Sequence, residues 1–133
     1  MQSKYNILLA LYEALNVPEV TNEIPSDMII IGKASKLLQG EFIVLNTINN
    51  PNGYIQNGFA NVNIHIPKFS EGRDNTFRLK KISEIIIPIL DDKKIETEHG
   101  TFYFQIDDDK GPFDDPDRDG ISYDNLRIEF QTL

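Results

Sequence analysis

The feature that most constrains the fold is a strict alternation of apolar and polar residues from Ala60 to Ile66. Side chains of a β-strand point alternately to its two faces, so this period of two predicts a strand with one apolar face and one polar face. The register of this strand is unambiguous, because a shift by one residue would exchange the two faces. The apolar face comprises Val62, Ile64 and Ile66, and the polar face comprises Asn61, Asn63 and His65.

Two later segments show the same alternation and predict two more strands. The first is Gly100–Ile106, where aromatic and aliphatic residues alternate with Tyr103 and Gln105, and the second is Tyr123–Thr132. We expect these two strands to pair as a hairpin with a long loop. Three other segments, bounded by glycine, proline and asparagine, are candidates for extended structure. They are Val20–Ile24, Met28–Ile31 and Glu41–Ile48.

The N-terminal segment predicts a helix. Ser3 is placed to act as its N-cap, and Asn16 and Pro18 stop it. Between these limits the apolar residues recur at helical spacing, which indicates one buried face. They are Ile7, Leu8, Leu11, Tyr12 and Leu15.

A second helix is predicted over Thr76–Leu90, with Asp74 or Asn75 as its cap. Pro88 lacks an N–H and crowds the carbonyl of Glu84, so the last turn should kink or stop. Together these segments predict an α+β fold, in which two helices pack against a mostly antiparallel sheet within a single compact domain over residues 1–133.

Composition excludes several classes of protein. The chain of 133 residues contains no cysteine, which rules out disulfides, thiolate metal sites and a cysteine nucleophile. Its formal net charge of −8 argues against nucleic-acid binding through a basic surface. The apolar runs are too short for a membrane span, and the N-terminal residues lack the pattern of a signal peptide. We therefore expect a cytosolic protein that binds neither membrane nor nucleic acid specifically.

The segment from Asp107 to Asn125 holds eight of the 21 acidic residues of the chain. It contains the D-x-D-x-D-G spacing of a calcium loop, in which alternate carboxylates converge on the ion. Leu126 stands where the bidentate glutamate of such a loop is expected, and a strand pattern follows in place of a helix. We therefore expect a solvated acidic hairpin loop, with a calcium-dependent binding module as the alternative. The residues that would hold calcium are Asp115, Asp117 and Asp119.

Catalytic chemistry finds little support in the sequence. The two imidazoles, His65 and His99, lie in no nucleophile motif, and the glycines form no phosphate-binding loop. His65 on the polar face of a strand predicts a surface or interface residue, and His99 before Gly100 predicts a turn. We expect a protein that is not an enzyme and needs no cofactor. A small hydrolase that uses the aspartate cluster is a further alternative.

The order of elements resembles a known family. A helix, an extended region with EFIVLNTI, the strand FANVNIHIPK, the helix FRLKKISEIIIPIL, then GTFYFQIDDD and DNLRIEFQTL are similar to the small tail terminator or tail completion proteins of tailed phages and prophages. The similarity spans nearly the whole chain. It implies a non-enzymatic α+β subunit that assembles as a ring, commonly a hexamer, in the host cytoplasm and then in the virion. Its partners would be copies of itself, tail-tube proteins and head–tail connector proteins.

Such a ring suggests which residues lie between subunits. A neighbouring subunit could cover the polar strand face, and acidic loops facing a lumen would repel DNA. Five basic residues fall between Lys68 and Lys81, so this segment could meet the acidic loop of the next subunit. A solvated polar surface would explain the same charges. The predicted interface residues are Asn61, Asn63, His65, Lys80 and Lys81.

Overall fold

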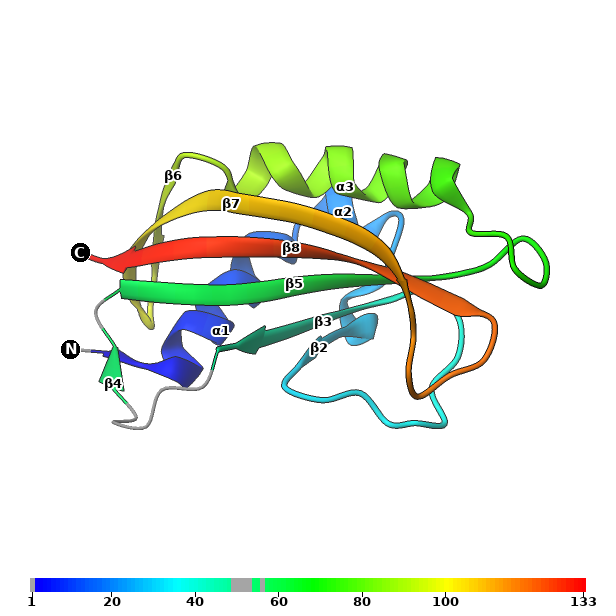
Figure 1. Ribbon diagram of the computed structural model, residues 1–133. Helices are drawn as coiled ribbons and strands as arrows, with labels where there is room; N and C mark the ends of the chain where they lie inside the picture. The colour runs from blue at the N-terminus through cyan, green and yellow to red at the C-terminus, as the bar shows by residue number, and fades with distance from the viewer. Residues whose placement is uncertain (1, 49–53, 56) are drawn as a thin grey trace.

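A six-stranded sheet forms the centre of the molecule, with the strand order β2-β3-β5-β8-β7-β6. The computed structural model describes residues 2–48, 54–55 and 57–133 (Figure 1). Strands β2 and β3 pair in parallel and the other neighbours pair antiparallel, which confirms the predicted mostly antiparallel α+β fold. The strands are β2 (Ile29–Ile31), β3 (Phe42–Thr47), β5 (Asn57–Pro67), β6 (Lys93–Thr97), β7 (Gly100–Asp114) and β8 (Ile121–Thr132). A separate short pair joins β1 (Gln2–Ser3) to β4 (Tyr54–Ile55).

Two long helices, α1 (Lys4–Leu15) and α3 (Thr76–Leu90), pack against one face of the sheet. We call this the inner face. Val62, Ile64 and Ile66 lie on it, and all three are fully buried, as their alternation predicts. Each such side chain stabilises the fold by about 1.5–3 kcal/mol relative to an exposed position. The core also takes in apolar side chains of both helices and the paired strands β7 and β8, which include Ile7, Leu11, Leu79, Ile86, Phe104 and Ile128.

The segment Val20–Ile24, expected to be extended, instead comprises the end of a short helix and the turn that follows it. Pro18 ends the first helix, as predicted, but it also occupies the first turn of the short helix α2 (Pro18–Thr21). Proline suits this position because the first N–H groups of a helix have no partner within the helix. A 3-10 turn, η1 (Ser26–Met28), then leads into β2. Pro18 therefore follows the end of α1 and begins α2, whereas we predicted only the end of the first helix.

Helix α3 has the predicted bounds, and Asn75 is its cap. The Asn75 side-chain oxygen accepts a hydrogen bond from the Arg78 amide at 3.2 Å. Pro88 does not stop the helix, which runs on to Leu90. Pro88 lies within the last turn, so its missing N–H removes one hydrogen bond at the end of the helix. The backbone carbonyls there already lack partners within the helix.

Most of the acidic segment belongs to two paired strands, whereas we expected a solvated loop. β7 continues to Asp114 and β8 begins at Ile121, so the turn comprises only residues 115–120. The register shifts between Ile106 and Asp108, and again between Lys110 and Phe113. Figure 1 shows this outer part of the hairpin bending away from the body of the sheet. We call residues 107–124 the acidic arm. Within the part of the chain that the structure describes, no helix is both long and apolar enough to span a membrane.

Candidate functional site

The face of the sheet opposite the helices carries a network of asparagine side chains. Asn61 donates to the side-chain oxygen of Asn46 at 2.8 Å. Asn125 donates to the side-chain oxygens of Asn61 at 3.1 Å and of Asn63 at 2.7 Å. The four residues come from β3, β5 and β8, and each is half-buried. The hydrogen bonds hold these amides in fixed positions on this face, which we call the outer face.

His65 lies in a row of stacked rings on the same outer face. Its ring centroid is 4.4 Å from that of Phe42 and 4.9 Å from that of Tyr123, and Phe113 lies 5.5 Å beyond Tyr123. These residues are direct cross-strand partners, so the pairing of β3, β5, β8 and β7 brings the rings together. His65 is only 7% exposed. The expectation of a surface residue was wrong, because rings of the same chain already cover it.

The turn at the end of the acidic arm is bound to His65 through Asp115. His65 Nδ1 lies 3.0 Å from Asp115 Oδ2, and Arg118 donates to the same oxygen at 3.1 Å. The Asp117 amide donates to Asp115 Oδ1 at 2.9 Å. The side chains of Asp115 and Arg118 are 1% and 3% exposed. This is a buried charge pair with an aromatic imidazole beside it.

Burial and pairing oppose each other in this cluster. Burial alone would raise the pKa of Asp115, but hydrogen bonds from the Asp117 amide and Arg118 outweigh it and lower the pKa. Burial lowers the pKa of His65 despite the nearby carboxylate of Asp115. The imidazole is therefore neutral near pH 7. Because a carboxylate can only accept, His65 Nδ1 carries the proton in this hydrogen bond.

Arg118 extends the cluster to the loop of residues 32–40. Its Nε donates to the Leu38 carbonyl at 2.8 Å, and its Nη2 donates to the Ser35 carbonyl. The guanidinium also lies 4.8 Å from the centroid of the Phe42 ring. These contacts hold the end of the arm against a loop 80 residues away in sequence. A hollow of about 190 Å³ opens beside them, lined in part by Asn63, His65 and Arg118.

The residues proposed for calcium do not converge in this arrangement. Both oxygens of Asp115 accept hydrogen bonds, whereas Asp117 and Asp119 are exposed. Gly120 has φ of +75°, so the D-x-D-x-D-G segment closes a turn around Arg118. A calcium ion would have to displace Arg118, which a calcium loop does not require. The geometry therefore does not favour the calcium module.

Among the residues described, three side chains from α1 and the turn between β6 and β7 are close enough to hold a metal ion. His99 Nε2 lies 3.6 Å from Glu13 Oε1 and 3.4 Å from Glu98 Oε1. His99 lies in the turn between β6 and β7, as predicted, and Glu13 belongs to α1. This group could not be predicted from the sequence, because folding brings Glu13 to the other two residues. Exposed acidic groups of this kind are also common without a metal.

Most basic residues of the segment 68–81 are paired within the chain. Arg78 forms two hydrogen bonds of 2.8 Å to Glu41 and one of 2.8 Å to Glu23. Lys81 lies 3.0 Å from Glu23, and hydrogen bonds from Arg78 and Lys81 lower the pKa of that glutamate. The remaining contacts are Lys80 to Glu84 at 3.6 Å and Lys68 to Asp114 at 2.7 Å. Lys80 and Lys81 remain exposed on α3, as expected.

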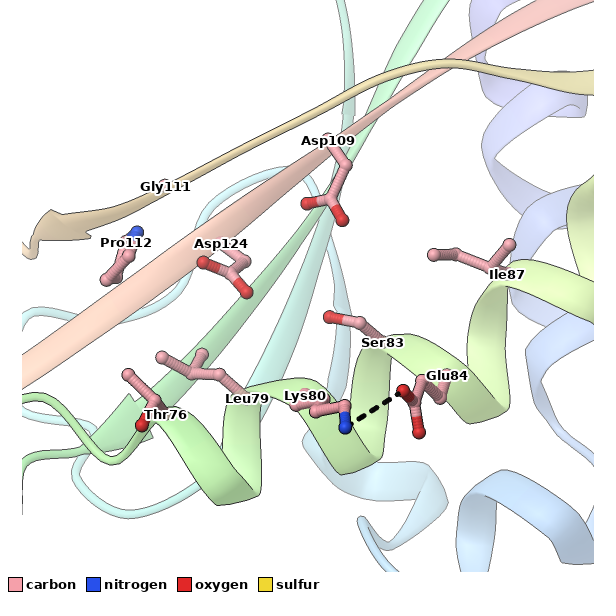
Figure 2. A pocket seen from close by; sticks show the side chains of 10 residues that line it. All are labelled: Thr76, Leu79, Lys80, Ser83, Glu84, Ile87, Asp109, Gly111, Pro112 and Asp124. Carbon is pink, nitrogen blue, oxygen red and sulfur yellow. Dashed lines mark ion pairs between the residues drawn. The ribbon is translucent and has the colours of Figure 1, made fainter.

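A pocket of about 480 Å³ lies between α3 and the helix-facing side of the acidic arm (Figure 2). Its acidic residues are Glu84 from α3, which pairs with Lys80, and Asp109 from β7 and Asp124 from β8. Burial, and then the charges of Asp109 and Asp74, raise the pKa of Asp124 to about 6. Burial and Asp108 raise the pKa of Asp109. The other lining residues are Thr76, Leu79, Lys80, Ser83, Ile87, Gly111 and Pro112.

Sequence reasoning missed this pocket, although one signal for it was present. Leu126, Ile128 and Phe130 alternate along β8 and are all buried. The same period puts residue 124 on that inner face, where an aspartate breaks the apolar series. A polar residue at a core-facing position is a common sign of a functional site.

Comparison with known proteins establishes the fold and nothing more specific. No family model matches the chain, and no curated protein is significantly similar to it. A solved protein structure superimposes with a TM-score of 0.65 at 10% sequence identity, covering 100% of this chain and 97% of the other. The name of that protein states no activity or partner. At this identity the likeness concerns the fold alone.

Proposed function

We propose that this protein is a structural subunit of the phage or prophage tail-terminator or head–tail connector type, acting through ring assembly and protein–protein contacts. The observation that carries the proposal is the one-sided sheet. Both long helices cover the inner face, and the outer face presents asparagines already fixed by hydrogen bonds. Fixed side chains lose little conformational entropy when a partner covers them, so such a face suits association.

Exposed aromatic side chains at one end of the molecule also support an assembly role. Phe69 is 58% exposed, Phe77 is 79% exposed, and Phe113 on the acidic arm is 44% exposed. Figure 1 shows the loop after β5 and the end of the arm at the side of the molecule opposite the two termini. Aromatic residues are enriched at protein interfaces relative to the rest of the protein surface. This end of the molecule is a second candidate contact surface.

The edges of the sheet favour contacts through side chains over strand addition. The edge strand β6 carries exposed Lys93 and Lys94, and charged residues of this kind oppose pairing with another strand. The other edge, β2, comprises only three residues. A ring would therefore be closed by the outer face, the aromatic end and the exposed Lys80 and Lys81 of α3. The net charge of −8 and the acidic arm would leave a lumen that repels DNA.

Light scattering over a range of protein concentration tests this proposal. We expect self-association, weaker for the isolated protein than in the presence of tail-tube and connector proteins, because the tube end would template the ring. In the host, assembly would occur in the cytoplasm and the ring would then remain in the virion. A protein that stays monomeric at every concentration, including in mixtures with tail-tube and connector proteins, would contradict the proposal.

A further inference from the structure

Two carboxylates occupy core-facing positions in the outer part of the β7–β8 hairpin. On β8 the buried series that ends with Leu126 continues to Asp124, and on β7 Asp109 is paired with Leu126. Both side chains therefore lie on the side of the arm that faces α3, where Figure 2 shows them above the helix. Asp124 is half-buried there, where an uncompensated charge costs free energy, and Asp109 is exposed beside it.

No group described in this chain supplies that compensation. Neither carboxylate takes part in an ion pair or a side-chain hydrogen bond within residues 2–48, 54–55 and 57–133. The nearest basic residue of the lining, Lys80, is directed to Glu84 at 3.6 Å (Figure 2). Instead, the negative charges of Asp109 and Asp74 disfavour the charged form of Asp124. The two acids are thus placed to receive a positive charge from outside.

Ser83 is an independent sign of a missing ligand. It is 6% exposed, and its hydroxyl is buried without a hydrogen-bond partner among the residues that the structure describes. Figure 2 shows this hydroxyl on the side of α3 that faces the two carboxylates. A buried hydroxyl normally has a partner, and in a helix it is often the carbonyl four residues earlier. Here it lines the pocket instead.

The size and walls of the pocket favour an organic cation over a metal ion. A volume of about 480 Å³ lies in the range of small-molecule sites. Calcium takes six or more oxygen ligands. This pocket offers the carboxylates of Asp109 and Asp124 and the hydroxyls of Thr76 and Ser83, because its third carboxylate, Glu84, pairs with Lys80. Its wall includes Leu79 and Ile87 from α3 and Pro112 from β7, which suit an aliphatic stem.

Gly111 keeps the carboxylate of Asp124 accessible in this pocket. A Cβ at residue 111 would lie 2.6 Å from Asp124 Oδ1 and 3.0 Å from the Tyr123 carbonyl oxygen. Its φ of +128° is also a conformation that side chains with a Cβ rarely adopt. Any other residue would therefore displace either the strand or the carboxylate.

We propose that this pocket binds an alkylammonium or guanidinium group, held between Asp109, Asp124 and the Ser83 hydroxyl, with its aliphatic stem against Leu79, Ile87 and Pro112. The cation offsets the repulsion between the two acids and gives the Ser83 oxygen a donor. Two sources share this chemistry. One is a free diamine or guanidine compound, and the other is a lysine or arginine side chain of a second copy of the chain. The site itself does not depend on the proposed ring.

Titration calorimetry with 1,5-diaminopentane and with agmatine tests the site in dilute protein. We expect saturable binding of one molecule per chain. Asp124→Asn should weaken it by about tenfold or more, because it removes a charge-assisted hydrogen bond. Asp119→Asn is the matched control, since it removes the same charge at an exposed residue outside the pocket. 1-Pentanol, which has the stem without the charge, should not bind measurably.

Three results would overturn the proposal. One is equal weakening by Asp119→Asn and Asp124→Asn, which would indicate diffuse attraction to an acidic protein. Another is saturable binding of magnesium or calcium that excludes the diamine. The third is the absence of diamine and agmatine binding together with unchanged self-association of Asp124→Asn. Circular dichroism and thermal melting of Asp124→Asn check that any loss of binding does not come from unfolding.

The two sources of the cation give different results in sedimentation. If a second copy supplies the side chain, Asp124→Asn weakens self-association and free agmatine competes with it. If the ligand is a free compound, Asp124→Asn loses agmatine binding but associates like the unchanged protein. Either result supports the cation pocket. Failure of the ring proposal alone would appear as a monomer that still binds agmatine.

Discussion

His65 Nδ1 and Asp115 Oδ2 lie 3.0 Å apart and join the end of β5 to the turn of the acidic arm, 50 residues later in the sequence. The contact is buried and shares Asp115 with Arg118. It therefore fixes the end of the arm, which a purely solvated acidic hairpin would leave free. Several consequences for stability and assembly can be measured.

Asp115→Ala should destabilise the protein by about 3 kcal/mol, because it leaves the Arg118 guanidinium buried without its carboxylate. Asp117→Ala, which removes an exposed carboxylate from the same turn, should change the stability by less than about 0.5 kcal/mol. Urea denaturation of both variants measures the difference. Similar effects of the two substitutions would show that the buried pair does not hold the arm.

His65 should make the protein less stable as the pH falls below about 6.5, the usual pKa of an unfolded histidine. Burial lowers the pKa of His65 in the folded state, so the neutral imidazole contributes stability above that pH. This stability is lost as the pH falls, because protons bind preferentially to the unfolded chain. His65→Gln should remove this dependence. The measurement is the difference in unfolding free energy between the two proteins from pH 7.5 to pH 5. A constant difference would contradict it.

Asp124→Asn should stabilise the protein at pH 7 by roughly 1 kcal/mol, once the partial exposure of the side chain is allowed for. The pKa of Asp124 is raised to about 6 in the folded protein, above its usual value in the unfolded chain. The protonated side chain therefore contributes stability that is fully present below the unfolded pKa. This stability is lost as the pH rises through 6. The gain from asparagine should therefore vanish near pH 4. Thermal melting at both pH values measures it, with Asp119→Asn as the control that should show no gain.

Asn63→Asp should weaken self-association while leaving the fold intact. Its side-chain oxygen still accepts from Asn125, but the substitution puts a negative charge on the outer face of each copy. Asn22→Asp adds the same charge at an exposed residue beyond α2 and serves as the control. Sedimentation velocity of both variants separates the effects. Unchanged assembly of Asn63→Asp would remove the outer face from the proposed interface.

Reversing Lys80 and Lys81 to glutamate should also weaken association, and more strongly at low salt, because screening reduces charge attraction between subunits. Both side chains are exposed, and the contacts they lose, to Glu84 and Glu23, are surface ion pairs that contribute little to stability. The same reversal at Lys93 and Lys94 on the β6 edge is the control. If the Lys80/Lys81 variant assembles normally at low salt, the segment 68–81 does not meet an acidic partner.

The elements that could be predicted are those whose pattern is local. The alternation from Ala60 to Ile66 identified β5 and its buried face, since burial depends directly on a period of two. Asn75 marked the start of α3 because an N-cap is a property of adjacent residues. Pro18 was ambiguous for the same local reason, since it is compatible with the end of one helix and the beginning of another.

The local pattern marked only Asp124 of the proposed cation pocket, and it marked nothing of the cluster at the end of the arm. The acidic residues of β7 have low strand propensity, and pairing with β8 overrides that propensity. His65 is on the polar face of its strand, but neighbouring strands bring Phe42 and Tyr123 to both sides of its ring. Exposure depends on such neighbours, which no single strand specifies.

The sequence by itself therefore determined the α+β class, the register of β5 and the bounds of α3, because period and capping are encoded in residues close together in the chain. Only the tertiary structure decided that Asp115 pairs with Arg118 and His65, and that Asp109 and Asp124 face α3 without a basic partner among the residues described. The physical reason is that the energy of a charge depends on its surroundings in space. Strand pairing and helix packing create those surroundings between residues far apart in sequence.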